Sequence, residues 1–270
     1  MSWSALLKKE WRASSTPFFI GVVGIIVIFS GIYYAMGRYS PFLFLFSYLS
    51  IFAHLLAVGL DLLHNLRKEW KENTVYVWLN LPLPGWQLIL SKLVITMIEF
   101  IITLMITLGF MYVLTNRAID LFGQRADGQE LVAGMEIFKE SFVEMIPIIL
   151  LVIPFVSILL AFGILFIYFM GKSYYRIGWI LGTVVVVVSF YGLIKFLDTP
   201  VFSVISEWGL IRHFSFPEQI MFEGGSETAI EVGEVLTLPL YAGQIVVGIV
   251  LLIAMFSLLS WMLDRKVQVG

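Results

Sequence analysis

Six apolar stretches constrain the fold of this chain more than any other feature. Each is long enough for the ~20 residues that a helix needs to cross a bilayer, and a backbone inside a bilayer satisfies its own polar groups by forming helices. Charged residues make up only 13% of the 270 residues, against about 25% in soluble domains. We therefore predict an all-α polytopic membrane protein, with a single transmembrane domain over residues 1–270 and six transmembrane helices at 17–36, 42–60, 88–114, 145–170, 176–196 and 238–262.

The distribution of lysine and arginine predicts which loops face the cytosol, because cations are retained on the cytoplasmic side. An even number of spans places both termini on one side. With the termini inside, eleven of the 17 Lys and Arg residues fall in cytosolic segments, and the outer segments hold only Arg38, Arg117, Arg125, Lys139, Lys195 and Arg212. We therefore expect both termini to be cytosolic.

Residues 1–14 carry charges where a cleaved signal peptide needs an apolar core, so we expect no cleavage. Trp3, Leu7 and Trp11 fall on one side of a helix, and Lys8 and Arg12 fall on another. This pattern favours a helix that lies in the membrane interface, and a polar lead-in to the first span is the alternative.

Residues 61–87 form the cytosolic segment between the second and third spans. From Arg67 onward the segment mixes charged residues with tryptophans, and Pro82 and Pro84 then bar a continuous helix. We predict a short amphipathic helix followed by a sharp break. A helix that lies flat on the cytosolic face, joined rigidly to two spans, is well placed to pass a push from a soluble partner into the bilayer.

Residues 115–144 form an outer loop with apolar side chains at three- and four-residue steps, namely Leu131, Met135, Phe138 and Phe142. This spacing predicts an amphipathic helix that continues into the fourth span, with Asp127 as its cap.

Residues 198–237 form a second outer segment, which is too long for a turn and too polar to span. Its two apolar pieces, 201–211 and 229–238, suit two short helices that re-enter the outer leaflet, and a folded surface loop fits them equally well. In the span before it, Gly178 and Gly182 have the G-x-x-x-G spacing that permits close helix approach. Packing within the chain explains these glycines as well as dimerisation does.

The sequence lacks the motifs of several enzyme classes. It has no G-x-x-x-x-G-K-[ST] loop, so any ATP would be hydrolysed by another subunit. It has neither H-E-x-x-H nor G-x-S-x-G, the signatures of zinc metalloproteases and serine hydrolases. It also has no cysteine, which excludes disulfides and thiolate metal sites. We expect a protein that is not an enzyme and binds no cofactor or metal directly.

Glu99 and His54 form the candidate intramembrane polar site. A carboxylate within a span is expensive and by default indicates a functional site or an internal partner. Glu99 lies only seven residues beyond Lys92, so a structural pair with a cation or hydroxyl stands beside a role in substrate passage or proton coupling. His54 fits a satisfied polar residue better than it fits a ligand.

The whole arrangement resembles the membrane subunit of an ABC-2 type ABC transporter, a bacterial permease that works with a separate ATPase. The local similarity is greatest over residues 72–92. There the family's acidic residue, threonine, Leu-rich helix, Leu-Pro turn and lysine correspond to Glu72, Thr74, Trp78 with Leu79, Leu81 with Pro82, and Lys92, and Trp86 follows the turn. The chain departs from the family's pattern in the second proline, Pro84, and in the large Trp78.

The resemblance implies a half-transporter in the bacterial cytoplasmic membrane. It would pair with a second permease chain, identical or homologous, and bind two copies of an ABC ATPase that supplies ATP and Mg. Within the cytosolic coupling segment, residues 61–87, the part from Arg67 to Leu81 would be the coupling helix. The ATPase would be contacted by Arg67, Trp70, Glu72, Thr74, Trp78, Leu79 and Pro82. Residues 1–14 would be the elbow helix, and the two short outer helices would cap the exit. The expected function is export of an amphipathic or hydrophobic cargo, such as a peptide, an antibiotic or a lipid-like molecule.

Two other functions compete with export. A proton-coupled secondary transporter would use Glu99 as its proton carrier, but one intramembrane carboxylate and no evident inverted repeat make a poor coupling site. A non-transporting immunity or sensory subunit would recruit a partner, but it would not need the docking segment to be joined so tightly to the third span.

Overall fold

The computed structural model describes residues 3–76, 83–125, 128–174, 177–217 and 235–266. Within these ranges the helices are α1 (Trp3–Arg38), the 3-10 helix η1 (Pro41–Phe44), α2 (Leu45–Lys71), α4 (Gly85–Gly123), α5 (Gln129–Ser173), α6 (Gly178–Leu197), α7 (Pro200–Ser206) and α8 (Ala242–Arg265). The strands are β1 (Leu210–Pro217) and β2 (Val235–Tyr241).

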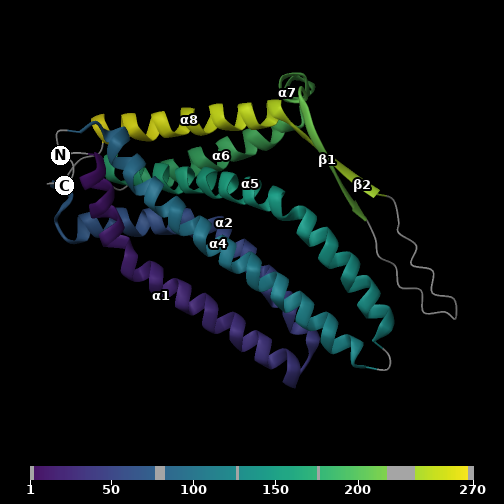
Figure 1. The fold of residues 1–270 in the computed structure, drawn as a ribbon. Helices are drawn as coiled ribbons and strands as arrows, with labels where there is room; N and C mark the ends of the chain where they lie inside the picture. The colour runs from purple at the N-terminus through teal and green to yellow at the C-terminus, as the bar shows by residue number, and fades with distance from the viewer. Residues whose placement is uncertain (1–2, 77–82, 126–127, 175–176, 218–234, 267–270) are drawn as a thin grey trace.

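Six helical segments are long and apolar enough to cross a membrane, namely α1, η1 with α2, α4, α5, α6 and α8. The six helices predicted as spans are therefore present, with the length and composition of a multi-pass membrane protein. Several helices extend well beyond the predicted spans, and α5 has 45 residues. At 1.5 Å per residue, α5 is about 68 Å long, roughly twice the ~30 Å hydrocarbon core. Segments expected as separate loops are therefore continuous with the spans (Figure 1).

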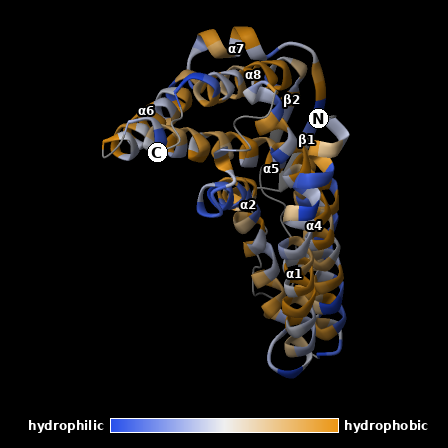
Figure 2. Ribbon diagram, turned by 90° about the vertical axis from the view of Figure 1, so that its left-hand side faces the viewer, coloured by the Kyte–Doolittle hydropathy of each residue, from blue (hydrophilic) through white to orange (hydrophobic). Residues whose placement is uncertain are grey.

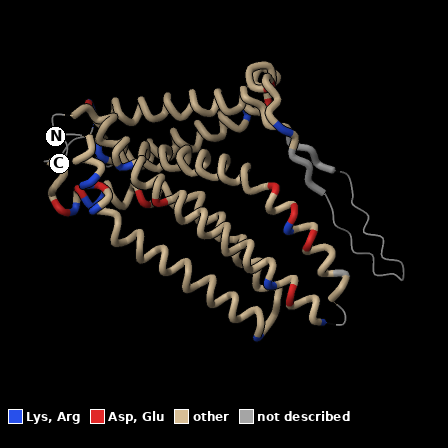
Figure 3. The backbone as a smooth tube through the Cα atoms, viewed as in Figure 1, with Lys and Arg blue, Asp and Glu red and all other residues tan. Residues whose placement is uncertain are grey.

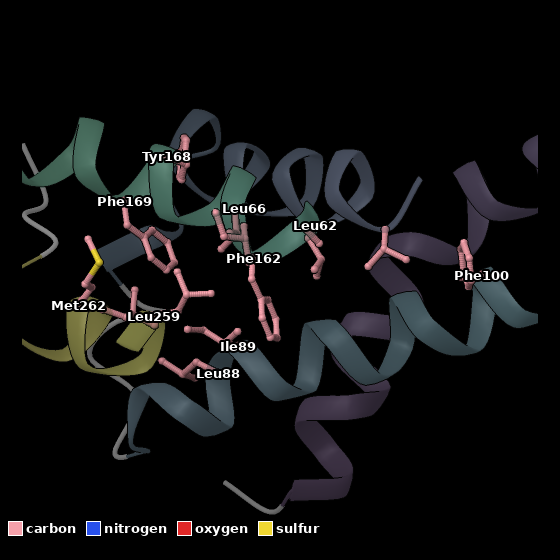
Figure 4. Close-up of a cluster of buried hydrophobic side chains, with 14 of the residues drawn as sticks. Leu62, Leu66, Leu88, Ile89, Phe100, Phe162, Tyr168, Phe169, Leu259 and Met262 are labelled. Carbon is pink, nitrogen blue, oxygen red and sulfur yellow. The ribbon is translucent and has the colours of Figure 1, made fainter. Parts of the chain in front are cut away.

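The helices α4 and α5 lie at the centre of the bundle. The helix α2 packs against both of them, α1 packs mainly along α4, α6 packs against α5, and α8 packs against α4 and α5. Figure 4 shows the larger core cluster, in which side chains of α2, α4, α5 and α8 meet, among them Leu62, Leu66, Leu88, Ile89, Phe162, Phe169, Leu259 and Met262. A second cluster, which includes Phe29, Phe44 and Phe122, joins α1, η1 and α4 to the start of α5.

Polarity follows the helix ends. Hydrophobic residues line the lengths of the helices (Figure 2), and both termini lie at one end of the bundle, where many Lys, Arg, Asp and Glu residues gather (Figure 3). We call this the terminal end. The start of α1 and the end of α8 share this end, as an even number of spans requires.

The N-terminal segment predicted as a separate elbow is instead the start of α1. Residues 3–14 are helical and run directly into the first span, with Pro17 inside the helix. Figure 1 shows that α1 changes direction after its first turns. Proline removes a backbone hydrogen bond and bends a helix without ending it when neighbouring helices support the backbone.

Of the two short helices predicted in residues 198–237, the first forms in part as α7, whereas the described end of the second is a strand. Residues 229–234 lie outside the described residues. The first apolar piece is helical only within α7, and Leu210 and Ile211 begin β1. Residues 235–238 of the second piece belong to β2, which pairs antiparallel with β1 from Leu210↔Tyr241 to Pro217↔Val235. The Leu-Thr-Leu-Pro-Leu run of β2 has the two-residue period of a strand, so the all-α prediction missed this two-stranded sheet.

The amphipathic helix predicted before the fourth span is confirmed as the first part of α5. Met135 and Phe142 are buried, and Leu131 and Phe138 pack beside the second cluster. The residue at the helix N-cap is Gly128, and Asp127 lies outside the described residues.

The two glycines of the G-x-x-x-G pattern lie against α5. A Cβ atom on Gly178 would be 2.1 Å from the carbonyl oxygen of Met170, and one on Gly182 would be 3.1 Å from the Cα of Ile167. Contact within the chain therefore accounts for both glycines.

Candidate functional site

A group of five polar side chains at the terminal end joins three helices, and we call it the ionic clamp. Its members are Lys9 and Glu10 of α1, Glu69 of α2, Thr74 after α2, and Lys92 of α4. The Nζ atom of Lys92 is 2.7 Å from Glu10 Oε2 and 3.1 Å from Glu69 Oε1. Only 3% of the Lys92 side chain is exposed, so its charge is paired inside the protein, as a buried charge requires.

Glu69 is the centre of the clamp. Its Oε1 also accepts a hydrogen bond from Lys9 Nζ at 3.0 Å, and its Oε2 accepts one from Thr74 Oγ1 at 2.5 Å. Glu69 lies in the last turn of α2, past the apolar stretch that ends near residue 60. Burial alone would raise the pKa of its carboxyl, but the charge of Lys92 and the hydrogen bonds from Thr74 and Lys9 outweigh burial and lower the pKa from 4.5 to about 2.

The first turns of α1 reach the clamp through a stripe of residues four apart. Leu6, Glu10 and Ser14 are all buried and face α4. Two of them pair with residues seven apart on α4, because Glu10 contacts Lys92 and Ser14 Oγ donates to Glu99 Oε1 at 2.5 Å. Residues four and seven apart lie on one face of a helix, so the two contacts hold α1 and α4 in register.

The same end of the bundle is tied at two further places. The backbone N–H of Gly85 at the start of α4 donates to Asp264 Oδ1 of α8 at 2.8 Å. A Cβ atom on Gly85 would be 2.5 Å from that oxygen, so the contact depends on glycine. On α5, the Tyr168 ring meets the Trp70 ring edge to face at 5.5 Å between centroids, and Lys172 Nζ lies 5.4 Å from the Trp70 centroid.

The predicted ATPase-contacting residues fall into three groups. Arg67 and Trp70 belong to the last turns of α2, so this part of the coupling segment continues the second span instead of forming a separate helix. Arg67 and Glu72 are exposed, whereas Trp70 is half-buried. Thr74 belongs to the ionic clamp, and Trp78, Leu79 and Pro82 lie outside the described residues.

Beside the end of α2 is a hollow of about 920 Å³. Its wall combines aromatic rings with an excess of cations, and it is lined by His64, Arg67, Lys68, Trp70, Lys71, Glu72, Tyr168, Lys172 and Trp179. The one carboxylate in this set, Glu72, is 4.0 Å from Lys68.

The predicted elbow residues do not share one environment. Trp3 is 37% exposed, Leu7 and Trp11 are half-buried, and the Trp11 ring lies 6.0 Å from that of Phe18. Two of the three buried residues in this segment, Glu10 and Ser14, are polar. A helix that only lies in the membrane interface needs no buried polar side chains.

The two intramembrane polar residues, Glu99 and His54, line a single groove of about 540 Å³ bounded by α1, α2 and α4. Glu99 has the hydroxyl partner that was one of its expected alternatives, Ser14. His54 Nδ1 lies 3.0 Å from the Ser50 carbonyl oxygen, and the backbone carbonyl of His54 accepts a hydrogen bond from Ser157 of α5. One ring nitrogen of His54 thus has a partner within its own helix, and its backbone joins α2 to α5.

Several clamp and tether residues were not among the predicted site residues, namely Lys9, Glu10, Glu69, Gly85 and Asp264, and Lys92 was named only through the family resemblance. A signal existed for Glu10, because a carboxylate on the same helical side as Trp3, Leu7 and Trp11 needs a partner. Glu69 and Asp264 lie in charged stretches that are typical of solvated ends, so nothing in the sequence sets them apart.

No group of three or more His, Asp or Glu side chains is placed to hold a metal ion within the described ranges. Comparisons with protein-family models, with curated protein sequences and with solved structures give no match.

Proposed function

We propose that the chain is the membrane subunit of an ATP-driven exporter of the ABC-2 type, which moves an amphipathic or hydrophobic cargo outward with energy from a separate ATPase subunit. The six apolar helices and the common end of the termini are consistent with this class. ATP and Mg would be held by two copies of the ATPase, and a second permease chain would complete the transporter.

The ionic clamp is the observation that carries the proposal. The chain between α2 and α4 leaves α2 two residues after Glu69 and re-enters the bundle at Gly85. Both points of attachment are fastened, the first by Glu69 and Thr74 and the second by Asp264. Lys92, in the second turn after Gly85, then joins both attachments to α1.

A displacement of this connecting segment by a bound partner would therefore move several helices together. Packed interfaces respond to such a displacement by rigid shifts between discrete arrangements and not by gradual deformation. The clamp would transfer the movement of a docked ATPase to α1, α2 and α4, and the Gly85–Asp264 hydrogen bond would carry it to α8. A recruitment subunit without transport has no need for this linkage.

The cation-rich hollow beside α2 supplies a docking face of fitting chemistry. Arg67 and Glu72 are exposed on it, while Trp70 is held against Tyr168 and Lys172. In this arrangement the charged residues meet the ATPase, and Trp70 supports the wall that they stand on. The partner surface would carry an excess of carboxylates.

A test is affinity purification of the full chain from its native membrane in mild detergent, followed by mass spectrometry and an ATPase assay. We expect a stoichiometric partner with a phosphate-binding loop and ATP hydrolysis. Recovery of the chain alone, or with a partner that hydrolyses no ATP, would contradict the proposal.

Variants at the docking face sharpen this test. Arg67→Ala combined with Glu72→Ala should reduce the co-purified ATPase several-fold, because it removes two charged contacts from the docking face. Both side chains are exposed, so their removal should leave the fold intact. Lys8→Ala removes an exposed cation from α1 and should leave recovery unchanged. Equal loss in both variants would show that recovery of the ATPase does not depend on the exposed residues at the end of α2.

A further inference from the structure

The groove between α1 and α2 is open along most of the first span. Its walls come from α1 and α2, and its floor comes from α4. The floor residues Glu99, Thr103 and Thr107 follow each other at four-residue steps, so they form one line along α4. The groove has a polar end near Glu99 and an apolar arm that leads away from it.

The polar end holds two carboxyl groups. Among the described residues that line the groove, the formally charged ones are Glu99 and Asp61, and no Lys or Arg lines it. Asp61 is near enough to Glu99 for the two charges to interact, and one oxygen of Glu99 already accepts a hydrogen bond from Ser14. A positively charged group is the natural complement of two carboxylates that face one cavity.

The apolar arm follows one face of α1. Phe18, Gly21, Ile25 and Ile32 line it at three-, four- and seven-residue steps. From Pro17 to Ile32 the helix rises about 22 Å, a large part of the ~30 Å hydrocarbon core. A Cβ atom added to Gly21 would meet nothing within 4 Å, so this part of the wall is open.

A buried polar atom also lies in the arm. Thr107 lines the groove and is fully buried, and its Oγ1 has no hydrogen-bond partner among the described residues. A buried hydroxyl without a partner is costly, and an apolar chain in the arm would leave that cost unchanged.

We propose that this groove binds a single-chain amphiphile with a protonated amine at one end. The amine would lie between Glu99 and Asp61, and the apolar body would extend along α1 past Gly21 and Thr107. This inference rests on the groove alone and not on ATP-driven export, because binding needs no ATPase.

Binding can be measured with radiolabelled dodecylamine on the purified full chain in phosphatidylcholine nanodiscs, without any ATPase. A primary amine is protonated at pH 7. We expect saturable binding that unlabelled dodecylamine displaces, while dodecanoate, which has the same chain and the opposite charge, does not. Displacement by dodecanoate as effective as that by dodecylamine would overturn the charge argument.

Two variants locate the site. Glu99→Gln keeps an acceptor for Ser14 but removes the charge, and it should weaken binding by about tenfold or more, the loss expected for a hydrogen bond to a charged group. Gly21→Phe leaves both carboxylates in place and fills the arm, so it should abolish saturable binding.

A matched control is Gly31→Phe, which adds the same ring to α1 at another open position outside the groove lining and should bind normally. Saturable binding that survives both Glu99→Gln and Gly21→Phe would overturn the proposal, because the probe would then bind elsewhere. If Glu99→Gln fails to fold, the comparison of Gly21→Phe with Gly31→Phe still decides.

Discussion

Two lysines contact the same oxygen of Glu69, and we predict that replacing them has very different consequences. Lys92 Nζ and Lys9 Nζ lie 3.1 Å and 3.0 Å from Glu69 Oε1. The two side chains differ in burial, since Lys92 is 3% exposed and Lys9 is 40% exposed. The pair therefore separates the effect of burial from the effect of distance.

The Lys92→Met variant leaves two carboxylates, Glu10 and Glu69, buried without their main partner. Breaking a buried ion pair by removing one member costs about 3–5 kcal/mol. The Lys9→Met variant removes a partly solvated contact, for which the cost is about 0–1 kcal/mol. For a protein of this size, each kcal/mol moves the thermal midpoint by about 2–4 °C, so Lys92→Met should lower it by about 6–20 °C and Lys9→Met by about 4 °C or less.

The assay is the thermal midpoint of the detergent-solubilised full chain. It is measured as the temperature at which heating has removed half of the monodisperse peak in size-exclusion chromatography. A triple variant, Lys92→Met with Glu10→Gln and Glu69→Gln, removes the charges together and should recover most of the loss, because no buried charge is left unpaired. Equal midpoints for Lys92→Met and Lys9→Met would refute the assignment of Lys92 as a buried clamp. A triple variant no more stable than Lys92→Met would refute the electrostatic reason for it.

Two other predictions concern pH and helix packing. The pKa of Glu69 is lowered in the folded chain from 4.5 to about 2, so its stabilising contribution is present above about pH 4.5 and is lost as the pH falls toward 2. Between pH 5 and pH 3, the Glu69→Gln variant should therefore lose less stability than the wild type. Parallel profiles of stability against pH for the two proteins would count against the lowered pKa of Glu69. Gly182→Leu should cost about 1–3 kcal/mol by overpacking the contact with α5, whereas Gly192→Leu on the same helix meets open space and should be near neutral. Equal midpoints for the two glycine variants would argue against the α5–α6 contact.

The sequence predicts the spans well because its signal for them is strong. Long apolar runs have one stable solution in a bilayer, and the three- and four-residue spacing from Leu131 to Phe142 correctly predicts the start of α5. The limits of these elements were harder to predict. The chain around residues 115–123 and 67–71 is polar enough for a loop, yet it continues α4 and α2.

The clamp could not be predicted, because it depends on which helices are neighbours. Glu10 and Lys92 are 82 residues apart in the chain, and no local spacing links them. For residues 198–237 a different reason applies. Apolar pieces of about ten residues are ambiguous between helix and strand, and pairing with a distant segment decided in favour of the sheet formed by β1 and β2.

The proposed export function depends most on docking of an ATPase by the segment after α2. The chain has no cysteine of its own, so a single Glu72→Cys variant can carry a photoactivated cross-linker at that exposed position without background. Cross-linking in native membranes, followed by mass spectrometry, identifies whatever protein contacts it. Docking at this segment predicts a cross-link from Glu72→Cys to a protein with a phosphate-binding loop. It predicts none from Tyr39→Cys, an exposed position just after the other end of α1. A Glu72→Cys variant that cross-links only to lipid, or to a protein without such a loop, would contradict it.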